Sequence, residues 1–180
     1  MKKTDVVGLH SEFFEEHGFL LNQSQLLFDR TFPHGKQVVF VHFEEGLEES
    51  YLEYHLGIRI NAVEELIQKY LPTPDNYAKR SITLVQTPDK LGNSYPMRIR
   101  VSDKKELSEV VHSFENFFLT TGFNWLDKMI DPIILEQEFL LHKENHFESF
   151  NLEESAFRST ALSKPVLYTN LKLPAISSLL

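Results

Sequence analysis

Residues 51–60 have the sequence YLEYHLGIRI, the most regular alternating stretch in the chain. Apolar or aromatic side chains occupy every second position, at Leu52, Tyr54, Leu56, Ile58 and Ile60. The polar residues Glu53, His55 and Arg59 stand between them. Because successive side chains of a strand point to opposite faces, this pattern predicts a strand with one face in the core and the other in water.

The residues before this strand predict a helix and a β-hairpin. The helix spans about Leu9 to His17, and Gly18 ends it because glycine accepts the left-handed conformation found after helices. A strand at about Gln25 to Phe32 and a second one at Gln37 to Glu44 flank the turn signal at residues 33–36. The hairpin therefore leads directly to the strand at residues 51–60.

The residues after this strand predict another helix, started by Asn61 with Glu64 in its first turn, and two further strands. These strands, about Ser81 to Thr87 and Tyr95 to Val101, flank a turn-rich segment and are expected to form a second hairpin. From residue 103 onward the apolar spacing is helical. Three helix starts are expected, at Asp103, Asp131-Pro132 and Asn151, and Gly122 is expected to end the first of these helices.

This order predicts a two-layer α+β fold, in which about five mostly antiparallel strands are covered on one face by helices. The C-terminal half is helical. A parallel crossover through the helix after Asn61 would instead make the sheet mixed, and the pattern leaves this alternative open. We find no repeat and no linker, so we expect one domain over residues 1–180, with a mixed part at about 1–101 and a helical part at about 103–180.

Composition excludes several classes of function. The chain has no cysteine, which excludes thiol chemistry and disulfides, and its seven glycines stand at least ten positions apart, which excludes the glycine-rich phosphate-binding loops. A charge of −8 argues against nucleic-acid binding. No apolar run is long enough for a signal peptide or a membrane span. We therefore expect a cytoplasmic protein that has no cofactor and contacts neither nucleic acid nor membrane.

Five carboxylates are concentrated within ten residues, at Glu44, Glu45, Glu48, Glu49 and Glu53. No basic residue stands among them. They could form an acidic docking patch for a basic protein partner, because concentrated charge accelerates and orients association. Alternatively, they form a solvated loop whose charges keep strand edges from pairing with other chains.

A basic cluster is the alternative site, on the open face of the sheet. Arg30 interrupts the apolar face of Leu26, Phe28 and Phe32, and a buried guanidinium there requires a carboxylate or carbonyl partner. The outward strand positions add His55, Arg59, Arg98 and Arg100. Together they could bind an anion or a small-molecule substrate. The competing interpretation is that they are ordinary solvent-facing residues paired with Glu53 and its neighbours.

A metal site is not expected, although one weak candidate exists. Glu138, His142 and His146 are spaced at i, i+4 and i+8, which would place them on one stripe of a helix. Leu135 and Phe139 share that stripe, so we interpret the helix face as structural.

The N-terminal half, about residues 9 to 71, resembles a bacterial family of uncharacterised α+β domains. The resemblance rests on Gly18-Phe19, Arg30, Gln37-Val38-Val39 and Leu56-Gly57-Ile58. It implies a small cytoplasmic bacterial protein without known catalytic residues, similar to some immunity proteins of contact-dependent toxin systems. No serine–histidine–aspartate set or carboxylate pair has spacing specific to catalysis. We therefore favour a non-enzymatic interaction domain, with a small-molecule-binding protein or enzyme as the alternative.

Overall fold

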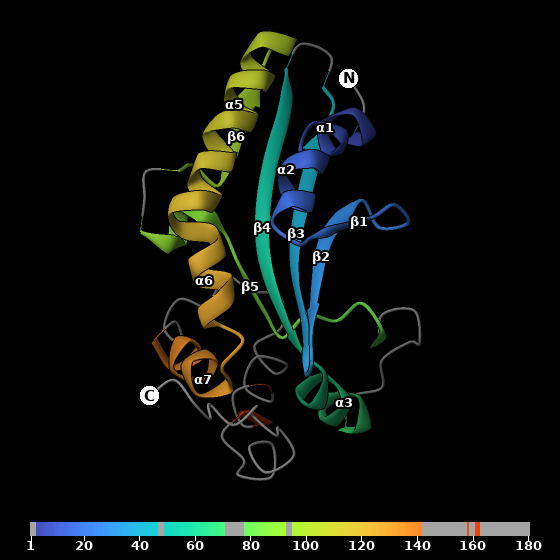
Figure 1. Cartoon of the computed structure of the whole chain (residues 1–180), viewed down its shortest axis with the longest axis vertical. Helices are drawn as coiled ribbons and strands as arrows, with labels where there is room; N and C mark the ends of the chain where they lie inside the picture. Colours follow the sequence, from blue (N-terminus) through green and yellow to red (C-terminus); the bar gives the residue numbers. More distant parts are fainter. Residues whose placement is uncertain are drawn as a thin grey trace.

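The computed structural model describes residues 3–46, 49–70, 78–92, 95–141, 158, 161 and 162. They form an antiparallel sheet with helices packed on one face, which confirms the predicted α+β class (Figure 1). The strands are β1 (Leu20–Asn22), β2 (Leu27–Phe32), β3 (Gly35–Glu44), β4 (Ser50–Ile60), β5 (Leu84–Gln86) and β6 (Arg98–Val101). The helices are α1 (Lys3–Leu9), α2 (Ser11–Glu16), α3 (Asn61–Tyr70), α5 (Lys104–Phe117), α6 (Phe123–Lys128) and α7 (Pro132–Leu141).

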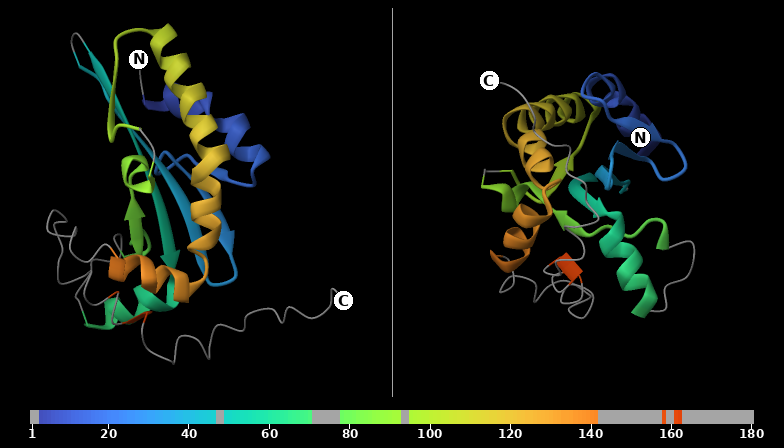
Figure 2. Two further views of the ribbon diagram at one scale, coloured as in Figure 1. Left: turned by 90° about the vertical axis from the view of Figure 1, so that its left-hand side faces the viewer. Right: turned by 60° about the horizontal axis from the view of Figure 1, so that its bottom comes forward.

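β4 is the centre of the sheet. Its alternate residues from Leu52 to Ile60 are buried, as the sequence pattern predicts. It pairs with β3 along almost its whole length, and both β5 and β6 pair with its other edge. The helices α1, α2, α5 and α6 lie on the face that carries Tyr54, whereas α3 and α7 lie at one end of the sheet (Figures 1 and 2). We call the opposite face of the sheet the outer face.

The predicted second hairpin is wrong. β5 pairs with residues 56–58 and β6 with residues 50–53, so the two strands follow one another along the same edge of β4. The 3₁₀ helix η1 (Pro88–Leu91) lies between them. Turn signals indicate where the chain bends but do not fix the strand with which the next segment pairs. All pairings are antiparallel, which excludes the mixed-sheet alternative for the described strands.

The N-terminal boundaries also differ from the prediction. The helix expected at Leu9 to His17 is two helices, α1 and α2, and β1 was not expected. β2 begins at Leu27, because Leu26 has a φ of 51° and belongs to the turn before it. Gly18 does adopt the left-handed conformation predicted for it, with a φ of 79°.

Gly122 does not end the long helix, contrary to the prediction. α5 continues through a π-helical segment, η2 (Phe118–Gly122), directly into α6. Asp103 caps α5 as expected, since its carboxylate accepts hydrogen bonds from the backbone of Lys105 and Glu106. α7 starts at Pro132, directly after Asp131, as expected, while the predicted helix start at Asn151 lies outside the described residues. No helix among the described residues has both the length and the apolar character to span a membrane.

Candidate functional site

The strand register brings the acidic and the basic candidates together on the outer face, where β3, β4 and β6 meet. Arg98 forms an ion pair with Glu44, and its Nε lies 3.5 Å from the carboxylate of Glu53. Arg100 donates a hydrogen bond of 2.7 Å to Glu49. We call these five residues the charged patch. Three residues of the predicted acidic site and two of the predicted basic site therefore form one surface, in which the opposite charges are paired.

Tyr51 holds part of the charged patch in place. The guanidinium of Arg98 lies 4.2 Å above the centre of the Tyr51 ring, and the Tyr51 hydroxyl donates to Glu49 over 3.2 Å. Glu45 is exposed just beyond β3, and Glu48 lies outside the described residues. Because three of the five predicted carboxylates face arginines, the patch is not uniformly negative, and each exposed pair contributes at most about 1 kcal/mol to stability.

His55 and His42 lie beside the charged patch, with ring centres 4.9 Å apart. Burial lowers the pKa of both histidines. The nearby His55 lowers the pKa of His42 further, whereas the nearby Glu53 partly offsets the effect of burial on the pKa of His55.

Among the described residues, no group of three or more His, Cys, Asp or Glu side chains could hold a metal ion. Glu138 lies on α7, and its expected co-ligands His142 and His146 lie outside the described residues.

Arg30 does not join the other four basic candidates. It lies on the helix-covered face, where it donates to the backbone oxygen of His17 over 3.1 Å and forms an ion pair with Asp127 of α6. Its Nε donates to Gln37 over 2.6 Å, and Gln37 also donates to Asp127. Arg30 thus finds both a carbonyl and a carboxylate, as its position on an apolar face required, and it ties β2 to α2 and α6.

Arg59 is likewise bound within the protein. Its Nη1 donates to the backbone oxygen of Ala78 over 3.2 Å and to the hydroxyl of Ser81 over 2.7 Å. Its Nε donates to Asn61. Arg59 therefore fastens the segment before β5 to β4, and the five basic candidates do not converge on one anion site.

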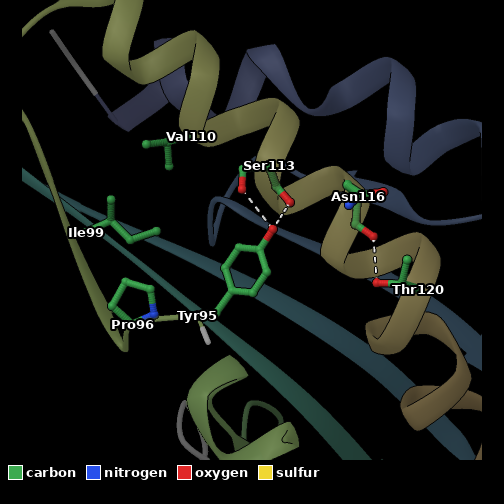
Figure 3. Close-up of a pocket in the computed structure, with 7 residues that line it drawn as sticks. All are labelled: Tyr95, Pro96, Ile99, Val110, Ser113, Asn116 and Thr120. Atoms are coloured by element: carbon green, nitrogen blue, oxygen red, sulfur yellow. Dashed lines mark hydrogen bonds between the residues drawn. The ribbon is translucent and has the colours of Figure 1, made fainter. Parts of the chain in front are cut away.

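A groove of about 550 Å³ lies between α5 and the chain that leads into β6 (Figure 3). The hydroxyl of Tyr95 reaches across it to Ser113, donating to the backbone oxygen and lying 2.8 Å from the side-chain hydroxyl. The other residues lining the groove are Pro96, Ile99, Val110, Asn116 and Thr120. None of the lining residues carries a charge near neutral pH, so this groove suits an uncharged ligand and provides no carboxylate or imidazole for acid–base chemistry.

Two buried polar clusters were not predicted. His10, between α1 and α2, is fully buried; its Nε2 lies 2.7 Å from the Tyr54 hydroxyl and its Nδ1 lies 3.3 Å from the carboxylate of Glu115. Burial lowers the pKa of His10 to about 4 and raises that of Glu115. Nothing in the sequence marks this cluster, because its members are far apart along the chain and meet only where α5 and the α1–α2 segment pack on β4.

The second cluster centres on Glu64, which is 1% exposed. Its two oxygens accept hydrogen bonds of 3.0 Å from Nε and Nη2 of Arg158, and Thr83 donates to one of them over 2.9 Å. Burial by itself would raise the pKa of Glu64, but Arg158 and the hydroxyls of Ser81 and Thr83 hold it below its ordinary value. Glu64 was expected to favour the start of α3 electrostatically; its hydrogen bonds also join α3 to Arg158 and Thr83.

Comparison of the chain with protein-family models, with curated proteins and with solved structures gives no match. The function is therefore inferred from the sequence, geometry and charge of the chain itself.

Proposed function

We propose that this chain is a non-enzymatic interaction domain that binds a basic protein partner. The observation that supports it is the unequal pairing of charges. Arg30, Arg98 and Arg100 each face a carboxylate of the same chain, so these three guanidinium groups are not available to an anionic partner. By contrast, α2 carries three exposed carboxylates, Glu12, Glu15 and Glu16, that have no cationic partner among the described residues.

A surface with unpaired negative charge attracts basic partners over distances near the Debye length and orients them before contact. The net charge of −8 acts in the same direction. Together with the resemblance of the N-terminal half to immunity-like domains, this supports a protein of the bacterial cytoplasm that neutralises a basic partner. The charged patch then contributes orientation more than attraction, because its carboxylates already face arginines.

The test uses the full chain and two model peptides. One is an amphipathic helix of Leu and Lys, and its counterpart has Glu in place of every Lys. We expect the Leu/Lys peptide to bind, with an affinity that falls as salt is added, and the Leu/Glu peptide not to bind, as measured by fluorescence anisotropy. Equal binding of both peptides, or no binding of the Leu/Lys peptide, would contradict the proposal.

The groove of Figure 3 supports a second candidate, the binding of an uncharged small molecule. A ligand that fits it would raise the unfolding temperature of the protein by several degrees in a panel of neutral metabolites. The variant Val110→Trp, which fills the groove from α5, should lose that shift. A shift that persists in this variant would place the ligand elsewhere.

A further inference from the structure

A second groove lies on the helical layer, between the α1–α2 segment and α5. It measures about 360 Å³, and we call it the α2–α5 groove. Figure 2 shows α1 and α2 beside α5 on the same side of the sheet. Leu9, Glu12, Phe13 and Glu16 line one wall, and Ser108, Val111, His112 and Glu115 line the other.

The floor of this groove is apolar. Val111 is 4% exposed, and Phe13 is partly buried against the core. Leu9, the last residue of α1, is 52% exposed even though it lines the groove. A partner that covers a large aliphatic side chain at the mouth of a groove stabilises the complex by about 25 cal/mol for each Å² of apolar surface removed from water.

The rim of the groove is acidic. Glu12 and Glu16 stand one helical turn apart on α2, both are exposed, and neither has a cationic partner among the described residues. Glu115 faces them from α5 and uses one oxygen, Oε1, toward His10. Partial burial raises the pKa of Glu115, so a cation placed in the groove would stabilise its charged form. No Lys or Arg lines the groove; its one basic lining residue is His112, which partly offsets the effect of burial on the pKa of Glu115.

We propose that the α2–α5 groove is the docking site for a basic amphipathic helix of the partner protein. This inference rests on the proposed function and names the surface and the chemistry of the partner. One aliphatic or aromatic side chain of that helix packs on Leu9, Phe13 and Val111. Lys or Arg residues one turn apart pair with Glu12 and Glu16, whose own spacing matches the i, i+4 spacing of a second helix.

The experiment measures the affinity of the Leu/Lys peptide for single variants of the full chain. Glu16→Gln and Glu12→Gln should each weaken binding about three-fold, and the double variant about ten-fold, as for partly exposed ion pairs. Glu15→Gln is the matched control: it removes the same charge from the same helix at an exposed position that does not line the groove. It should leave the affinity unchanged.

A second variant tests the apolar floor. Leu9→Ser should weaken binding of the Leu/Lys peptide, and wild-type protein should bind a peptide with Ser in place of Leu more weakly. Leu9 is largely exposed, so the variant should keep the far-ultraviolet circular dichroism and unfolding temperature of the wild type. No effect of Leu9→Ser would overturn the docking site.

The possible failures are distinguishable. If Glu15→Gln weakens binding as much as Glu16→Gln does, the peptide senses only total charge; the groove is then overturned while the proposed function stands. If the wild-type protein does not bind the Leu/Lys peptide at all, the proposed function fails and the docking site fails with it. A loss confined to Glu12, Glu16 and Leu9 variants is the result we expect.

Discussion

At the scale of single residues, His10 makes the stability of the fold depend on pH. Burial lowers its pKa from 6.5 to about 4 in the folded protein, whereas the unfolded chain keeps the ordinary value. Below about pH 6.5 the unfolded state therefore binds a proton that the folded state does not. The free energy of unfolding should fall by about 3 kcal/mol between pH 6.5 and pH 4 and should be insensitive to His10 above that range.

The measurement is a series of urea unfolding curves across this pH range for the wild type and for His10→Gln. Glutamine can still hydrogen-bond to Tyr54 but does not titrate. His42 and His55, whose pKa values are also lowered, make the free energy of unfolding fall with decreasing pH in both proteins. The difference in the free energy of unfolding between the two proteins at each pH therefore isolates the contribution of His10. If the free energy of unfolding depends on pH in the same way for the two proteins, the pKa of His10 does not differ between the folded and unfolded states as proposed.

Glu64 is the second residue on which the free energy of unfolding should depend strongly. Glu64→Gln removes the buried carboxylate that accepts hydrogen bonds from Nε and Nη2 of Arg158, so we expect a loss of about 3 kcal/mol in the free energy of unfolding. Because the folded pKa of Glu64 is below its ordinary value, this contribution is present at neutral pH and is lost as the pH falls through the folded pKa.

Its neighbour Glu65 supplies the control for that variant. Glu65 is exposed on the same helix, and Glu65→Gln should change the free energy of unfolding by less than about 0.5 kcal/mol. Equal effects of the two substitutions in urea unfolding at pH 7 would refute the assigned role of the Glu64–Arg158 pair.

At the scale of elements, the π-helical segment η2 depends on the absence of a side chain at Gly122. A Cβ at this position would lie 2.6 Å from Cδ1 of Phe118 and 3.2 Å from Cε1 of Phe117, and both rings are buried. Gly122→Ala should therefore destabilise the protein by about 1–3 kcal/mol, although alanine favours helices. Gly8→Ala in α1 meets no atom within 4 Å and should stabilise it by up to about 1 kcal/mol. Chemical unfolding that gives both variants the same sign would contradict this account.

Elements were predictable where the signal is local. The alternation of residues 51–60 identified β4, and Asp103 identified the start of α5, because strand faces and helix caps depend on neighbours in sequence. The arrangement of β5 and β6 was not predictable, since both pair with β4 and the choice of partner is a long-range contact. Gly122 misled the prediction because a glycine can be required by close packing, here against Phe118 and Phe117, as well as by a helix end.

The candidate site shows the same division. The charged residues were all visible in the sequence, but the cross-strand register decided that Arg98 and Glu53 would pair and that Arg30 would face the helices instead. The α2–α5 groove joins residues about a hundred positions apart, so its acidic rim has no signature in the sequence.

At the scale of the whole molecule, the two layers divide the charge between them. On the outer face of the sheet, carboxylates and arginines alternate across strands and pair with one another. On the helical layer, the carboxylates of α2 have no cationic partner among the described residues, and two of them border a groove with an apolar floor. The excess negative charge is therefore most available to a partner on the helices, which is why the proposed docking site lies there and not in the acidic segment at residues 44–53.

Folding should also shift the isoelectric point of the molecule. The sequence gives a value of about 5.5, which assumes ordinary histidines that are mostly protonated at that pH. In the folded protein His10 stays neutral there, and the lowered pKa values of His42, His55 and Glu64 also remove positive or add negative charge. The raised pKa of Glu115 acts in the opposite direction but concerns a single group. The isoelectric point should therefore be lower in native isoelectric focusing than in focusing with urea. His10→Gln should reduce the difference between the two isoelectric points, because it removes a group that is charged only in the unfolded chain. A native isoelectric point equal to or higher than the denatured one would contradict the neutral state of the buried histidines in the folded protein. It would also remove the basis for the predicted loss of stability of the protein at mildly acidic pH.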